Sequence, residues 1–216
     1  MRFCAIATLA MLWVFPGHAQ DVQIQVDTSS NPELAKWCES ARREMVLWHP
    51  RMENLLATEG FVPPHTFSLS TKNAEKGVGY TVGTRITVIS GFVKRHPRDV
   101  GMVIHEMIHV IQAYPNKGKK PGWLVEGIAD YARWAMYNGK SLKQFPRPKK
   151  EQAWKDGYQV TAGFLLWMES GRAPGIVRRL NTSLRQGVYE DGLWERWGGA
   201  PLPALWEAYY DAMQAR

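Results

Sequence analysis

Two histidines and a glutamate stand at metal-ligand spacing in the apolar segment "VIHEMIHVIQ", residues 103–112. His105 and His109 are four residues apart, so on a helix they project from one face and can direct two imidazole nitrogens to a point about 2 Å from each. This arrangement suits a zinc ion. Glu106 lies roughly 100° around the helix from His105, where it can reach a water molecule at the metal without binding the metal itself. The alternative is a buried helix with two hydrogen-bonded histidines.

A third ligand must come from another segment, because catalytic zinc usually has three protein ligands and keeps a fourth position for water. The segment "WLVEGIADYARW" places Glu126 and Asp130 on one helix face amid apolar residues. Burying two carboxylates is costly unless they are paired or bind a metal. Glu126 is therefore the predicted third ligand, and Asp130 is predicted to accept the free ring N–H of a ligating histidine. Ligation by Asp130, with Glu126 outside, stays open, as does a solvent-facing acidic edge.

Together these residue types could activate a water molecule at a bound zinc ion for attack on a carbonyl. Glu106 would take a proton from the activated water and deliver it to the leaving amine. Tyr158, in "KDGYQVTAGF", is the candidate for stabilising the oxyanion, because a phenol can donate a hydrogen bond to a developing negative charge. A packing role is the alternative for Tyr158, and Tyr131, Tyr114 and His96 are substitutes for it.

Gln112 and three further histidines are the remaining polar residues that could contribute to a site. Gln112 lies seven residues after His105 and returns to the same helix face, where it could hydrogen-bond near the metal or simply pack. His49, His65 and His96 are isolated from this group, and we expect them to be ordinary surface or turn residues.

The N-terminal part of the chain predicts one helix followed by strands. Residues 31–60 have apolar residues at helical spacing, with Asn31 as the expected N-cap and Pro50 expected to break or kink the helix. Residues 65–71 and 79–90 have the alternation and β-branched content of strands, which predicts one small mixed sheet. The second of these segments could be an edge strand that pairs with an extended peptide, or an interior strand.

Helical periodicity takes over after the strands. The predicted helices cover residues 98–114, 121–139, 158–171, 173–187 and 202–216. The loop "PNKGKKPG" is long enough to reverse the chain, which would make the second of these helices antiparallel to the first. Strands followed by helices predict an α+β domain.

The first residues of the chain predict a secretory signal. An apolar run after Arg2 leads to Gly17 and Ala19, which suit a signal-peptidase site, and the run is shorter than the roughly 20 residues that span a bilayer. Residues 1–19 are thus expected to be cleaved, leaving residues 20–216 as a single domain that is secreted to the periplasm or the extracellular space.

The composition indicates which classes of molecule the protein is expected to bind. The net charge of +7 and the pI near 9.5 favour attraction to an acidic cell-wall surface. Nucleic acid is not an expected partner, because the sequence has no zinc-finger spacing and no RNA-recognition motif. No membrane span is expected, and the protein is expected to be a monomer. Cys38 would be the one cysteine left after cleavage, and a buried, inert thiol is expected there.

Three blocks, "HEMIHVIQAY", "GWLVEGIADYARW" and "GYQVTAGFLLWME", resemble the signatures of the basic secretory protein family, peptidases of plants and bacteria in the zincin group of HExxH metallopeptidases. The resemblance runs from about Pro32 to the C-terminal helix. It implies a zincin-like fold, in which a small mixed sheet precedes a mainly helical half with the HExxH helix, and secretion. The carboxylate pair looks like that of gluzincins, which gives the ligand role to Glu126 and the outer role to Asp130. Gln112 and Pro115 replace the residues of the longer metzincin motif.

The resulting hypothesis is a secreted zinc (Zn2+) metallopeptidase that acts on a peptide or protein substrate, with His105, His109 and Glu126 as ligands and Glu106 as general base. The alternative is a basic cell-wall or glycan-binding protein whose zinc site is structural or vestigial. Glu106 distinguishes the two hypotheses, because a structural site has no need for a base beside an open coordination position.

Overall fold

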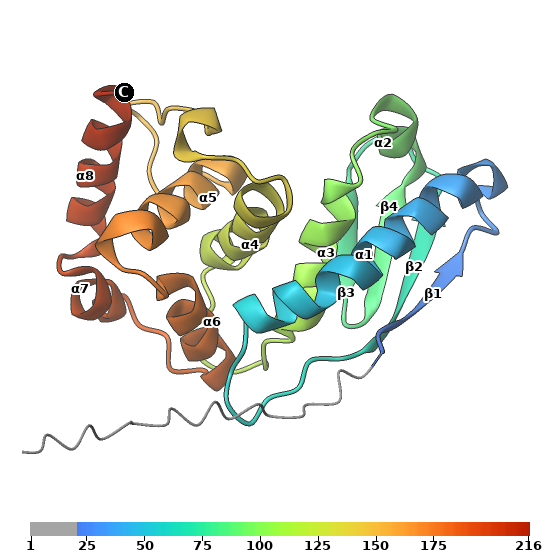
Figure 1. Cartoon of the computed structure of the whole chain (residues 1–216), viewed down its shortest axis with the longest axis horizontal. Helices are drawn as coiled ribbons and strands as arrows, with labels where there is room; N and C mark the ends of the chain where they lie inside the picture. Colours follow the sequence, from blue (N-terminus) through green and yellow to red (C-terminus); the bar gives the residue numbers. More distant parts are fainter. Residues whose placement is uncertain (1–20) are drawn as a thin grey trace, which may run out of the picture.

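A four-stranded sheet lies in the N-terminal part of the chain, and helices make up most of the rest (Figure 1). This computed structural model describes residues 21–216. The predicted signal segment, residues 1–19, lies outside the described residues. The predicted fold class, an α+β arrangement with a small mixed sheet, is confirmed.

The sheet has the strand order β1-β2-β4-β3. The strands are β1 (Gln23–Asp27), β2 (Thr66–Lys72), β3 (Gly79–Val82) and β4 (Arg85–Ile89). β1 and β4 both run parallel to β2, whereas β3 runs antiparallel to β4. Alternate residues such as Leu69 and Ile86 are fully buried, as expected for a sheet with one face on the core. The order places β3 at one edge of the sheet and β4 inside it.

A long helix, α1 (Ala35–Leu55), follows a short 3-10 turn, η1 (Pro32–Leu34). Of the two effects predicted for Pro50, a break or a kink, the break is wrong, because the helix runs on past it to Leu55. Proline deprives the carbonyl one turn earlier, that of Val46, of its partner. Both Pro50 and Val46 are exposed, so water can satisfy this carbonyl. The expected N-cap residue, Asn31, makes no side-chain capping hydrogen bond.

The predicted burial of Cys38 on α1 is confirmed. Its side chain is fully buried, and burial raises the pKa of the thiol to about 11.

The central helix is α3 (Gly101–Gln112), which follows the short α2 (Ser90–Arg95). Eleven of the twelve residues of α3 are buried, the exception being His109. The helix packs on one side against α1 and the sheet, and on the other against α4 and the turn after it. A helix that is apolar around its circumference is buried on all sides. α3 therefore holds its polar side chains inside the protein.

The remaining elements form the helical part of the chain, whose helices were predicted except for α7. They are α4 (Gly122–Tyr131) with its π-helical extension η2 (Ala132–Tyr137), the 3-10 turn η3 (Leu142–Gln144), α5 (Tyr158–Trp167) with the π-helical η4 (Met168–Arg172), α6 (Ile176–Gln186), α7 (Gly192–Gly198) and α8 (Leu202–Gln214). Rings of Phe164, Trp194, Trp206 and Tyr209 lie 5.3–5.7 Å apart between these helices and form their apolar centre. Among the helices of residues 21–216, none combines the length and the hydropathy that a membrane-spanning helix requires.

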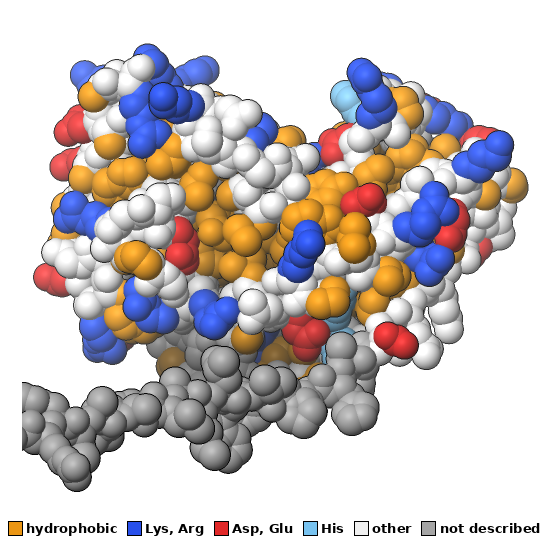
Figure 2. Space-filling model, in the orientation of Figure 1, with side chains coloured by type: hydrophobic (Ala, Val, Ile, Leu, Met, Phe, Trp, Pro, Cys, Tyr) orange, Lys and Arg blue, Asp and Glu red, His pale blue; other side chains and the backbone are white. Residues whose placement is uncertain are grey.

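Arg185 on α6 joins the helical part to the part that carries the sheet. The guanidinium is buried and donates hydrogen bonds to the carbonyl oxygens of Leu56 (2.8 Å), Ile111 (3.0 Å) and Gln112 (3.4 Å). These carbonyls stand at the C-terminal ends of α1 and α3. The two parts also meet where α3 packs against α4, and Figure 2 shows the surface hollowed between them, with hydrophobic side chains in the hollow.

Candidate metal centre

Helices α3 and α4 bring the predicted site residues together. His105, early in α3, lies beside Asp130, late in α4, whereas Gln112 at the end of α3 contacts the carbonyl of Val125 near the start of α4. Because the contacts run in reverse order along the two helices, the helices are antiparallel. The loop between them therefore reverses the chain as predicted from its length.

Three potential ligand atoms converge between the two helices. Nε2 of His105 lies 3.2 Å from Nε2 of His109 and 3.1 Å from Oε2 of Glu126, and the third side, from His109 to Glu126, is 3.5 Å. Ligands of a tetrahedral zinc ion, with bonds of about 2.0–2.1 Å, stand about 3.3 Å apart. Two nitrogens and one carboxylate oxygen are also common zinc donors. The three residues present thus fit a zinc ion in both spacing and chemistry.

The far side of each imidazole is held by a buried acceptor. Nδ1 of His105 donates to Oδ1 of Asp130 at 2.7 Å, and Nδ1 of His109 donates to Oε1 of Gln112 at 2.8 Å. Asp130 and Gln112 are 3% and 2% exposed, so neither acceptor is free to turn away. These bonds place the ring protons on Nδ1 and turn the Nε2 lone pairs toward Glu126, as partners of metal-binding histidines do.

The pKa values of the ionisable residues at the site depend strongly on one another. Burial alone would lower the pKa of His105, but hydrogen bonds to Asp130 and Glu126 outweigh it and raise that pKa to about 9. Burial likewise acts to raise the pKa of Glu126, whereas hydrogen bonds from His105 and His109 hold it well below its usual range. The carboxylates of Glu126 and Asp130 thus favour positive charge at this position, which a divalent cation would supply.

Glu106 lies beside this group, and a residue of the sheet holds its carboxylate by a hydrogen bond. The Thr81 hydroxyl on β3 lies 2.8 Å from Oε2 of Glu106 and 3.0 Å from its backbone carbonyl. Gly79, also on β3, lies close to α3, since a Cβ there would be 2.7 Å from the Met102 methyl group, the movable end of a flexible side chain. Sequence reasoning did not single out Thr81. Its place in an alternating strand was readable, but the packing of that strand on α3 was not.

A cavity of about 780 Å³ opens at these side chains. His105, Glu106, His109 and Glu126 line it, together with Val78 and residues 79–81 of the edge strand β3. The carboxylate of Glu106 and the converging ligand atoms therefore face one shared space into which a molecule can enter.

Tyr158 also lines the cavity. It is the first residue of α5, is 61% exposed and has a positive φ of 39°, directly after Gly157 with φ 103°. A tyrosine in this backbone region is uncommon, and such strain is found preferentially at functional sites. The structure thus brings Tyr158 to the predicted site with its side chain largely free of packing.

The three substitutes considered for Tyr158 lie less favourably. Tyr114 lines the cavity, but its hydroxyl donates to Oδ1 of Asn181 at 2.9 Å. Tyr131 is 5% exposed within α4, and His96 is exposed beside the ring of Phe92; neither lines the cavity.

The expectation for His49 needs correction. His49 is not a surface residue, since it is 1% exposed, and it lies with His65 around Glu53. Their separation in sequence gave no sign of this contact.

Comparison with known proteins identifies the chain. The family model described as "Peptidase of plants and bacteria" (BSP) matches residues 67–209, which include α3, α4, α5 and every candidate site residue. No curated protein and no solved structure matches the chain. Since the match covers more than half of the sequence, the protein belongs to the BSP family, the peptidases of plants and bacteria.

Proposed function

We propose that the protein is a secreted, zinc-dependent peptidase of the zincin type, with residues 20–216 as one domain. The observation that carries the proposal is the set of three ligand atoms 3.1–3.5 Å apart, beside Glu106, in a cavity. Membership of a peptidase family supports the reaction class. The signal-like segment at residues 1–19 supports secretion, and the basic charge suits an acidic wall surface.

His105, His109 and Glu126 are assigned as the zinc ligands. Asp130 accepts a hydrogen bond from a ring nitrogen of His105 and does not converge with the other three, which favours Glu126 as the third ligand. Zinc in such a site supplies Lewis acidity, which polarises a peptide carbonyl and makes a water molecule easier to deprotonate.

Glu106 is assigned as the general base. Its carboxylate faces the cavity and takes the proton of the attacking water, then returns that proton to the amine that leaves. Thr81 orients this carboxylate by donating a hydrogen bond to Oε2. The phenol of Tyr158, which begins α5 and lines the cavity, is assigned to donate a hydrogen bond to the carbonyl oxygen as negative charge develops on it.

The edge strand β3 is assigned as the binding surface for the substrate backbone. It is the last strand in the sheet order, and residues 78–81 line the cavity. An extended peptide can pair with such an edge and lay its carbonyls along the cavity. The side chain of Trp134, which also lines the cavity, would contact the side chains of the peptide.

The test is hydrolysis of an unbiased peptide library by the parent protein and by Glu106→Gln. Loss of a general base lowers turnover by about 10²–10⁴-fold, whereas metal content should stay at the parental value. Glu75→Gln, which makes the same change at an exposed carboxylate that pairs with Arg95, serves as the control and should keep full activity. Equal hydrolysis by Glu106→Gln and the parent, or hydrolysis that survives a chelator, would refute the proposal.

A further inference from the structure

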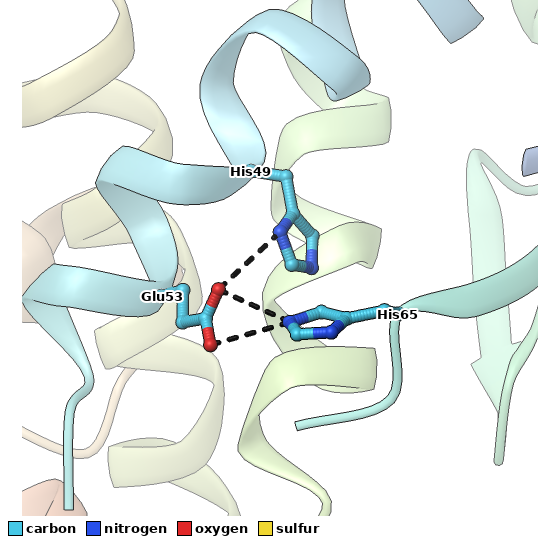
Figure 3. Close-up of side chains that lie close together, drawn as sticks. All are labelled: His49, Glu53 and His65. Carbon is cyan, nitrogen blue, oxygen red and sulfur yellow. Dashed lines mark hydrogen bonds and ion pairs between the residues drawn. The ribbon is translucent and has the colours of Figure 1, made fainter. Parts of the chain in front are cut away.

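A second group of two histidines and a glutamate lies where α1 ends and β2 begins. His49 and Glu53 are one turn apart on α1, and His65 immediately precedes β2. Figure 3 shows all three side chains directed toward one another, with the carboxylate of Glu53 opposite the two rings. None of them lines the cavity of the candidate metal centre.

The donor atoms of this group lie close enough for one ion to contact all three. Nε2 of His65 is 3.2 Å from Oε2 of Glu53, and Nδ1 of His49 is 3.8 Å from the same oxygen. One ligand atom from each residue lies within 4.8 Å of the others. The triangle is somewhat wider than that of the first group, and the partly exposed Glu53 side chain can close it by a rotamer change.

Burial gives the group an unusual feature. The His49 side chain is 2% exposed and stacks on Phe67, with ring centroids 6.0 Å apart. Its Nδ1 atom is the ring nitrogen that faces Glu53, and it lies 3.8 Å from Oε2, which is too far for a direct hydrogen bond. A buried ring held with this nitrogen toward a carboxylate, but out of hydrogen-bond range of it, leaves room for an ion between the two.

We propose that His49, Glu53 and His65 bind one divalent ion of the zinc class in a structural site. Two imidazoles and one carboxylate are donors that suit zinc and neighbouring transition metals, whereas calcium and magnesium require oxygen ligands. The ion would fasten the end of α1 to the start of β2 and so close the segment between them, residues 56–65. A water molecule would complete the coordination on the partly exposed side of Glu53.

This site is independent of the proposed peptidase function, because it shares no residue with the first group. Zinc bound to the metal-free, purified protein can therefore be counted separately for each group. The parent should bind two equivalents, and Glu53→Gln should bind one. Glu126→Gln should also bind one, and the double variant none. Glu39→Gln is the matched control, since it makes the same change at an exposed carboxylate on α1 and should keep both equivalents.

Thermal unfolding gives a second measurement. Zinc should raise the melting temperature of Glu126→Gln, in which only the proposed structural site remains, and should leave that of the double variant unchanged. His65→Asn tests the site through a different ligand, with His96→Asn at an exposed histidine as its control. If Glu53→Gln does not fold, His65→Asn takes its place in both measurements, with His96→Asn as the control.

The outcomes separate the two proposals. One equivalent that is lost in Glu126→Gln and kept in Glu53→Gln and His65→Asn would overturn the second site while supporting the first. One equivalent lost in Glu53→Gln and His65→Asn but kept in Glu126→Gln would support the second site and contradict the zinc ligands of the first. Absence of zinc binding by the parent would overturn both.

Discussion

Gly127 stands next to the proposed ligand Glu126, where α4 packs against α5, and its replacement by alanine should destabilise the protein. A Cβ at this position would lie 2.3 Å from Cγ2 and 3.0 Å from Cβ of Thr161 on α5. Thr161 cannot turn away at low cost, because it is fully buried and its hydroxyl donates to the carbonyl of Trp154 at 2.6 Å. The two helices must therefore separate, or this hydrogen bond must break.

The expected magnitude follows from two opposing effects. Overpacking a buried contact costs about 1–3 kcal/mol, and an overlap of this size belongs in the upper part of that range. Alanine in place of glycine within a helix returns up to about 1 kcal/mol. The free energy of unfolding of Gly127→Ala should thus fall by about 1–2 kcal/mol. For a protein of this size the melting temperature should fall by about 2–8 °C.

Thr161→Ser provides the control, because it removes the obstructing methyl group and keeps the hydroxyl that bonds to Trp154. Alone it should cost about 1 kcal/mol, mainly for the lost buried methyl group. In its presence Gly127→Ala should become neutral or stabilising, so the two changes should couple favourably by about 1 kcal/mol or more. Urea unfolding in excess chelator measures all four proteins without a contribution from bound metal. Additivity within about 0.5 kcal/mol would refute the steric argument.

Two further predictions concern Asp130 and Cys38. Asp130→Asn should weaken zinc binding at His105 by about 10–100-fold in a titration, because the imidazole loses the charged acceptor that orients it. The control is Asp99→Asn, which breaks an ion pair outside the group and should leave the affinity unchanged. Equal affinities in the two variants would contradict the role assigned to Asp130. Burial raises the pKa of the Cys38 thiol to about 11, so iodoacetamide at pH 8 should label it only as the chain unfolds, and fast labelling of the native protein would be evidence against this. Because that pKa is above the unfolded value of about 8.5, stability should be complete below pH 8.5 and fall as the pH rises toward 11, and Cys38→Ala should lack this alkaline loss.

The parts of the fold that repeat a pattern were readable from the sequence. Alternation in residues 65–71 and 79–90 predicted strands, and helical spacing predicted α3, α4 and α5. β1 was not predicted because only Ile24 of its five residues is buried, which leaves too weak an alternation. The break at Pro50 was predicted wrongly, because the cost of a proline within a helix depends on whether water reaches the freed carbonyl. The solvent exposure of that carbonyl cannot be read from the sequence.

The candidate site divides in the same way. His105 and His109 are related by local helix geometry, and their common direction follows from their spacing. The prediction of Glu126 as the third ligand required only one further assumption, that the next helix packs against the first. Thr81, by contrast, reaches Glu106 across a strand–helix contact, and His65 reaches His49 across a loop. Contacts of this kind depend on tertiary packing, which no periodicity in one segment encodes.

Arg185 bears on how a substrate would be selected. Its cationic group sits against the carbonyl ends of α1 and α3, where the helix dipoles concentrate partial negative charge, while its own backbone belongs to α6. Moving the helical part as a rigid body against the sheet would break several buried, charge-assisted bonds at once. We therefore expect preformed recognition with little hinge closure, so that the choice among peptides depends on the shape of a fixed opening.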